Sequence, residues 1–161
     1  MGRPGPKQDG TDVTSRWKDW IARRFGAEGA GAVTDRSRDL AVAALLVEVL
    51  RADFETSVTE RRQVLESLRD LLALDPGECD NLFADAERRV DHAHDLHQFT
   101  SEINAQLSHA QKLALMDQLW RVAQADAVVH KYEEHLIRRV ADLLHVSHRE
   151  FIAAKLRSAD L

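Results

Sequence analysis

Apolar residues recur every three or four positions from about residue 35 onward, which is the spacing of one buried face of an α-helix. In the first half of the chain two such stripes follow each other, formed by Val42, Leu45, Leu46 and Val49 and then by Val64, Leu65, Leu68, Leu71 and Leu72. No stretch alternates with the period of two that is typical of a strand, and the turn pair Asn-Gly does not occur. The pattern therefore predicts an all-α protein.

The second half of the chain carries a similar succession of stripes. Its members are Leu113, Met116, Leu119, Trp120 and Ala123, then Leu136, Ile137, Val140, Leu143 and Leu144, and finally Phe151, Ile152 and Leu156. Capping-box pairs mark three predicted helix starts, namely Asp75 with Glu78, Ser108 with Gln111, and Ser147 with Glu150. We expect the helix that starts after Asp75 to continue past Phe83 toward His97.

The two halves correspond under one shift of about 73 positions. Leu46 then matches Leu119, and Val64 matches Ile137. Ala52-Asp53 with Glu60 seven residues beyond the Asp recurs as Ala125-Asp126 with Glu133 at the same distance. The sequence thus predicts a helical bundle built from two duplicated three-helix units, at about 38–97 and 108–158, with an additional helix linking them.

The N-terminal part differs in composition from this domain, which we place at 35–161. Residues 1–12 contain mostly Gly, Pro and charged side chains, so we expect them to be disordered. Residues 13–34 hold an aromatic stripe, formed by Trp17, Trp20, Ile21 and Phe25, followed by a Gly-rich joint. This amphipathic helix is expected to cover a groove of its own domain; contact with a membrane surface or a partner is the less favoured alternative.

Composition narrows the class of protein. The 161 residues carry a formal net charge of -5, which gives no general attraction to nucleic acid. The one Cys, Cys79, cannot form an intramolecular disulfide and is best read as a small apolar residue on a helix. Because no apolar run resembles a signal peptide or a membrane span, we expect a cytoplasmic protein.

The repeated acidic residues are the sharpest indication of function. Asp53 and Asp126 fall at predicted helix C-termini, where the helix dipole disfavours a carboxylate by about 0.3 to 1 kcal/mol. Because the unfavourable residue occurs in both copies, we expect a compensating cation, Arg or backbone N–H nearby. Glu60 has a structural explanation as the partner of Ser57 in a capping box, whereas the equivalent partner of Glu133 is His130.

Neither loop alone is an EF-hand, which needs a Gly at its sixth position and a Glu at its twelfth. Counted from Asp53 or from Asp126, those positions hold other residues, which are Val58 and Val64 or Lys131 and Ile137. A cation would need ligands from both loops. The candidate site for a divalent cation (Ca, Mg, Mn or Zn) is therefore formed by Asp53, Glu60, Asp126 and Glu133; the alternative is that they are structural caps and exposed acids.

Other polar clusters give weaker indications. Asp91, His92, His94, Asp95 and His97 are expected on one helix, where two of them could join a zinc site, but the HExxH arrangement is missing. No Gly-rich phosphate loop, GxSxG turn or CxxC pair occurs. We therefore expect a non-enzymatic protein.

Several short motifs together resemble the TerB-like family of tellurite-resistance proteins. In order along residues 38 to 157 they are Leu45-Leu46-Val47-Glu48-Val49, Ala52-Asp53 with Glu60, His97-Gln98-Phe99-Thr100, Leu119-Trp120-Arg121-Val122-Ala123, Ala125-Asp126, the run from Tyr132 to Arg139, and Ala141-Asp142-Leu143-Leu144.

This resemblance implies a duplicated helical bundle, related to the N-terminal domain of a DnaJ-type co-chaperone. It also implies a cytoplasmic stress-response role with an unidentified protein partner, and metal binding by the acidic residues at Asp53, Glu60, Asp126 and Glu133. An interaction module of co-chaperone type without metal is the alternative. The chain departs from the family after each Asp, where Phe54 and Ala127 replace the usual Gly.

Overall fold

The computed structural model describes residues 32–52, 57–126 and 128–159. The predicted N-terminal disordered stretch and the aromatic segment before residue 32 lie outside these ranges. The same is true of Asp53, Phe54 and Ala127.

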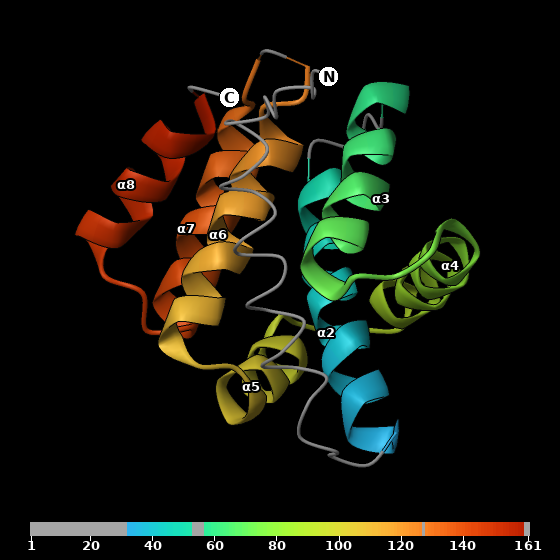
Figure 1. The fold of residues 1–161 in the computed structure, drawn as a ribbon. Helices are drawn as coiled ribbons and strands as arrows, with labels where there is room; N and C mark the ends of the chain where they lie inside the picture. The colour runs from blue at the N-terminus through green and yellow to red at the C-terminus, as the bar shows by residue number, and fades with distance from the viewer. Residues whose placement is uncertain (1–31, 53–56, 127, 160–161) are drawn as a thin grey trace, which may run out of the picture.

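Seven helices make up the described part of the chain, and no strand occurs there (Figure 1). They are α2 (Ala32–Leu50), α3 (Val58–Leu72), α4 (Pro76–Asp91), α5 (His97–Gln106), α6 (His109–Ala123), α7 (Lys131–Leu143) and α8 (His148–Ala159). The prediction of an all-α bundle is confirmed.

Two helices form the centre of the bundle. α2 contacts every helix from α3 to α7, and each residue from Ala41 to Val47 is buried. α6 contacts α2, α3, α7 and α8, and its side chains Leu119 and Trp120 are fully buried. Figure 1 shows α2 and α6 in the middle of the bundle, with α3 and α4 on one side and α7 and α8 on the other. A helix that is surrounded in this way is apolar on most of its faces, which explains the long hydrophobic runs in both.

Capping boxes start three of the helices, as the sequence predicts. Asp75 accepts from the Glu78 N–H at 2.8 Å, and Glu78 accepts from the Asp75 N–H at 3.1 Å. Ser108 with Gln111 and Ser147 with Glu150 make the same reciprocal bonds at 2.7 to 3.2 Å. Each pair satisfies two backbone donors that have no partner within the helix.

The third helix is shorter than we expected, because α4 ends at Asp91 and does not run on toward His97. At its end the His92 N–H bonds the carbonyls of Arg88 and Arg89, and the Ala93 N–H bonds that of Val90, which tightens the last turn. Asp95 then accepts from the His97 N–H at 2.9 Å and starts α5. The expectation that all five Asp and His residues share one helix is therefore wrong.

The helices follow in the order that a duplication would give. α2 contacts both α3 and α4, and α6 contacts both α7 and α8, while α5 lies between the two sets in the chain. The matched apolar pairs Leu46 and Leu119, and Val64 and Ile137, are all fully buried. These contacts agree with two related units, and the duplication itself stays a prediction.

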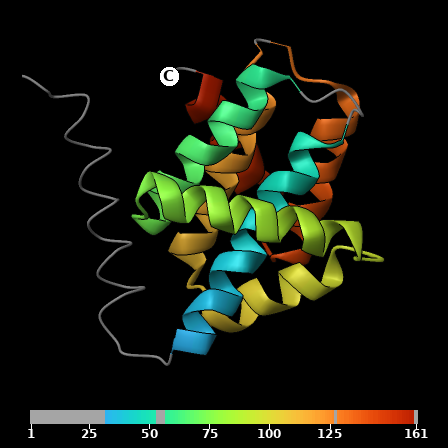
Figure 2. The same cartoon turned by 90° about the vertical axis from the view of Figure 1, so that its right-hand side faces the viewer.

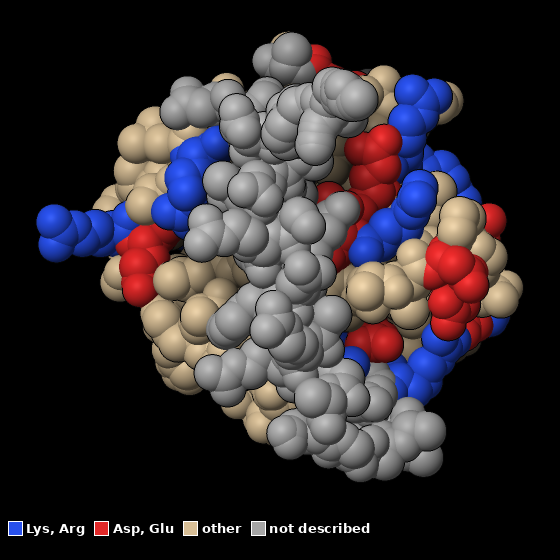
Figure 3. Space-filling model, in the orientation of Figure 1, with Lys and Arg blue, Asp and Glu red and all other residues tan. Residues whose placement is uncertain are grey.

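The surface of the bundle is mixed in charge. On the face shown in Figure 3, Lys and Arg side chains alternate with Asp and Glu side chains over the described part of the surface. Among the helices described, none is both long enough and apolar enough to span a bilayer.

Candidate functional site

The candidate cation site lies at one end of the bundle. α2 and α6 end there, and α3 and α7 start there, at the top of the view in Figures 1 and 2. Of the four acids that the sequence analysis selected, the structure describes Glu60, Asp126 and Glu133. Asp53 lies outside the described residues.

Glu60 lies in the first turn of α3 and is fully buried. The Ser57 hydroxyl accepts a hydrogen bond from the Glu60 backbone N–H at 3.0 Å, so Ser57 is the N-cap that we expected. Position near a helix N-terminus favours a carboxylate, because the dipole presents partial positive charge there.

Glu133 occupies the equivalent place in α7 and is also fully buried. Its Oε1 accepts a hydrogen bond from the His130 backbone N–H at 3.2 Å. This is the bond that the Glu of a capping box makes, and it does not depend on the side chain of the N-cap residue. Sequence analysis found no such role for Glu133, because the usual Ser or Thr is replaced by His130.

Asp126 differs from the two glutamates because it is exposed, in the turn that follows α6. Two polar residues follow Glu133 on α7, namely Glu134 and His135. Glu134 forms ion pairs with Lys155 at 3.1 Å and with Arg138 at 3.4 Å, which tie α7 to α8 and brace its first two turns. His135 is exposed on α7.

Two arginines, Arg51 after α2 and Arg61 on α3, pair with acids of α4. Arg51 pairs with Asp91 at 2.6 Å and with Glu87 at 3.6 Å, both on α4. The hydrogen bond to Asp91 is the main reason that the pKa of Arg51 is raised. Arg61, on α3, reaches the same Glu87 at 3.5 Å. The charges of these two arginines are thus directed toward acids of α4, and the compensation expected for Asp53 stays a prediction.

Glu48 is a further acidic residue near this end, and the sequence analysis did not select it. It is half-buried on the central helix α2, and burial raises its pKa, with a smaller opposite effect from Arg51. A signal was present in the sequence, because Glu48 is the single charged residue in the run from Leu45 to Leu50. A charged side chain inside such a run is costly to bury.

The described acids do not complete a metal site on their own. Within the ranges that the structure covers, no group of three or more His, Cys, Asp or Glu side chains is placed to hold a metal ion. The expected zinc ligands around α4 make other contacts: Asp91 pairs with Arg51, Asp95 accepts a hydrogen bond from the His97 N–H, and the His92 ring contacts the Arg88 carbonyl at 2.8 Å. A cation site would need Asp53 in addition to the buried glutamates.

The chain matches one family of known proteins. The family model described as "Tellurite resistance protein TerB" matches residues 39–156, which includes all seven helices in whole or in part. No curated protein and no solved structure gave a match. Since the matched region covers well over half of the chain, the protein belongs to the TerB family.

Proposed function

We propose that this chain is a non-enzymatic stress-response protein of the tellurite-resistance type that holds a divalent cation at the shared end of its two central helices. Asp53, Glu60, Asp126 and Glu133 would be the ligands. The observation that carries the proposal is the full burial of Glu60 and Glu133 in the first turns of α3 and α7, at the same end of the bundle.

Burial of a carboxylate requires compensation by hydrogen bonds, by an opposite charge or by a metal. The helix N-termini and the His130 N–H contribute such compensation here, and a metal ion would add to it. Carboxylate oxygens are the ligands that Ca²⁺ and Mg²⁺ prefer. A bound cation of this kind would neutralise acids from both halves of the chain and so link the loop after α2 to the loop after α6.

Titration calorimetry tests the cation directly. Ca²⁺, Mg²⁺, Mn²⁺ and Zn²⁺ are titrated into the full chain and into the Asp53→Ala, Asp126→Ala double variant. We expect a saturable heat with at least one cation, and its loss in the variant. Both positions lie outside the helix bounds, between Leu50 and Val58 and between Ala123 and Lys131, so circular dichroism should show unchanged helix content.

A matched variant distinguishes binding at a specific site from nonspecific attraction of cations to acidic side chains. Asp80→Ala with Asp142→Ala removes the same charge from exposed positions on α4 and α7, and it should retain the full heat. Negligible heats for the unmodified chain, or equal heats in all three proteins, would remove the cation from the proposal while leaving family membership intact.

A further inference from the structure

We propose that the aromatic segment at residues 13–25 packs into a hollow beside the C-terminal half of α3, in the same chain. The inference is independent of the proposed cation site, whose described glutamate Glu60 lies at the other end of α3. It requires a hollow of sufficient size, a segment that can reach it, and matching charge.

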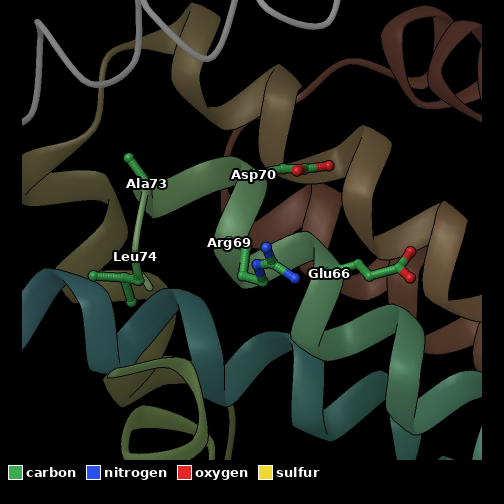
Figure 4. A pocket seen from close by; sticks show the side chains of 5 residues that line it. All are labelled: Glu66, Arg69, Asp70, Ala73 and Leu74. Carbon is green, nitrogen blue, oxygen red and sulfur yellow. The ribbon is translucent and has the colours of Figure 1, made fainter. Parts of the chain in front are cut away.

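The hollow has a volume of about 470 Å³. Its described lining comes from the end of α3 and the residues that follow, namely Glu66, Arg69, Asp70, Ala73 and Leu74, as Figure 4 shows. Leu74 is half-buried and Ala73 is exposed. In Figure 4 these two apolar side chains lie at one end of the lining, and the three charged side chains lie toward the other end.

A second hollow on the bundle provides a comparison. It lies between α2, α4 and α5, where Leu40 and Phe99 are among its lining residues, and its volume is about 90 Å³. Aromatic side chains bury about 150 to 250 Å² each, so a segment with three of them needs the larger space. The hollow beside α3 is therefore the better fit of the two.

The aromatic segment has one apolar face, which gains stability when it is buried. Trp17, Trp20, Ile21 and Phe25 recur at helical spacing, and a helix with such a stripe gains stability by burying it. Thirteen residues of helix are about 20 Å long, which is comparable with the length of α3. The segment thus has the size and the apolar face of a helix that would lie along α3.

The connection to α2 permits this placement. Residues 26–31 include three glycines and can extend over about 20 Å. α3 runs from the cation-site end toward the end of the bundle at which α2 starts (Figure 1). A segment that folds back from Ala32 therefore meets the C-terminal half of α3 first.

Charge supports the same occupant. The segment contains Arg16, Lys18, Arg23 and Arg24 against a single acid, Asp19. The hollow presents Glu66 and Asp70 on either side of Arg69, and Asp70 also lies 3.9 Å from Arg121 of α6. Opposite charges at the rim of a contact fix its register and orientation, and like charges placed there repel the partner strongly.

Paramagnetic relaxation in the full chain tests the contact. Asp19→Cys, which lies opposite the aromatic stripe on a helical wheel, is labelled with a nitroxide; Cys79 is 1% exposed and should not react. We expect amide signals from Glu66 to Leu74 to lose most of their intensity, and those of α8 to keep theirs. Strong losses on another helix, or none on the described chain, would overturn the proposal.

Two charge variants and a mixing control complete the test. Glu66→Lys with Asp70→Lys should restore the α3 signals, whereas Asp80→Lys with Asp142→Lys, at exposed positions elsewhere, should not. Should the first pair unfold the chain, Trp17→Ser with Trp20→Ser serves the same purpose. Signal loss in a mixture of labelled ¹⁴N chain and unlabelled ¹⁵N chain would show a second copy as the occupant. If phosphatidylglycerol vesicles abolish the signal loss on α3 and the chain floats with them, the segment binds a membrane surface. Either this result or signal loss in the mixed sample would contradict the proposal.

Discussion

Ala73 and His145 end α3 and α7 in the same left-handed conformation, with φ angles of 55° and 62°. The Ala73 N–H bonds the Arg69 carbonyl at 2.9 Å, which is the simple αL motif. In α7 the Val146 N–H bonds the Ala141 carbonyl at 2.8 Å and the His145 N–H bonds that of Asp142 at 3.2 Å, which together make a Schellman motif. Both motifs favour Gly at the left-handed position, and neither has it.

The first prediction follows from this strain. Ala73→Gly and His145→Gly should each raise the free energy of unfolding by about 0.5 to 1 kcal/mol, because relief of the left-handed strain exceeds the entropy that Gly adds to the unfolded chain. Both residues are exposed, so little packing is lost. Urea denaturation measures the change.

A Gly in an ordinary helical position gives the control. Ala105 is exposed on α5 and has no left-handed backbone, so Ala105→Gly should lower the free energy of unfolding by about 1 kcal/mol. A decrease in all three variants would show that the two helix ends carry no strain that Gly can relieve.

The second prediction concerns a buried polar contact between the halves of the chain. Ser67 of α3 donates from Oγ to Gln118 Oε1 of α6 at 2.7 Å, and both side chains are almost fully buried. Ser67→Ala should cost about 1 to 3 kcal/mol, because it leaves a buried acceptor without its donor. The free energy of unfolding in urea is the measurement.

A double-mutant cycle separates the hydrogen bond from packing. In Ser67→Ala, Gln118→Met the second change removes the stranded acceptor, so the pair should lose less stability than the two single changes added together. Additive losses would mean that the two side chains act independently.

Local sequence signals predicted the helices and most of their starts well. The capping pairs at Asp75, Ser108 and Ser147 each fix a helix start through bonds within four residues, so they can be read from the sequence. The end of α4 could not be predicted in this way, because the apolar pattern gives no stop before Leu96 and the tightening at His92 depends on backbone geometry.

The candidate site was less accessible to sequence reasoning. The selection of Glu60 and Glu133 rested on spacing, and their burial depends on which helices meet at that end of the bundle. The cap made by Glu133 was missed because His130 is not a usual N-cap residue. Pairing of Arg51 with α4 joins residues 40 positions apart, and such contacts leave no local pattern.

The third prediction uses the half-buried Glu48. Burial raises its pKa, so the ionised form is disfavoured in the folded chain relative to the unfolded one. Glu48→Gln should therefore stabilise the protein at pH 7, and the gain should disappear as pH falls below the pKa of Glu in the unfolded chain. The urea midpoints of the variant and the unmodified chain, measured from pH 7 down to below the pKa of Glu in the unfolded chain, test this prediction. If Glu48→Gln raised the midpoint equally at every pH, the effect would come from packing.

The fourth prediction concerns the thiol of Cys79. Burial raises its pKa to about 11, so little thiolate is present at neutral pH, and the side chain is 1% exposed. Because the thiolate is the reactive form, 5,5′-dithiobis(2-nitrobenzoate) should react with the folded chain only as fast as the protein opens. Addition of urea beyond the unfolding midpoint should release one equivalent of thiol at once. Rapid reaction without urea would show that α4 opens locally.

The fifth prediction links pH to the contact between α6 and α8. His109 Nε2 lies 2.8 Å from Glu150 Oε1, and this hydrogen bond is the main cause that lowers the pKa of Glu150 to about 2, with Ser147 adding to it. A carboxyl whose folded pKa is depressed contributes stability above its unfolded pKa, and that contribution is lost as pH falls from about 4.5 to about 2. Glu150→Gln should therefore lower the urea midpoint at pH 7, and the difference from the unmodified chain should narrow through this window. NMR titration of the Glu150 carboxyl carbon measures this pKa directly. The His109→Ala variant should move the pKa of Glu150 toward its ordinary value, and Ser147→Ala should move it by less. A pKa in the ordinary range in the unmodified chain would mean that the bond to His109 does not persist in solution.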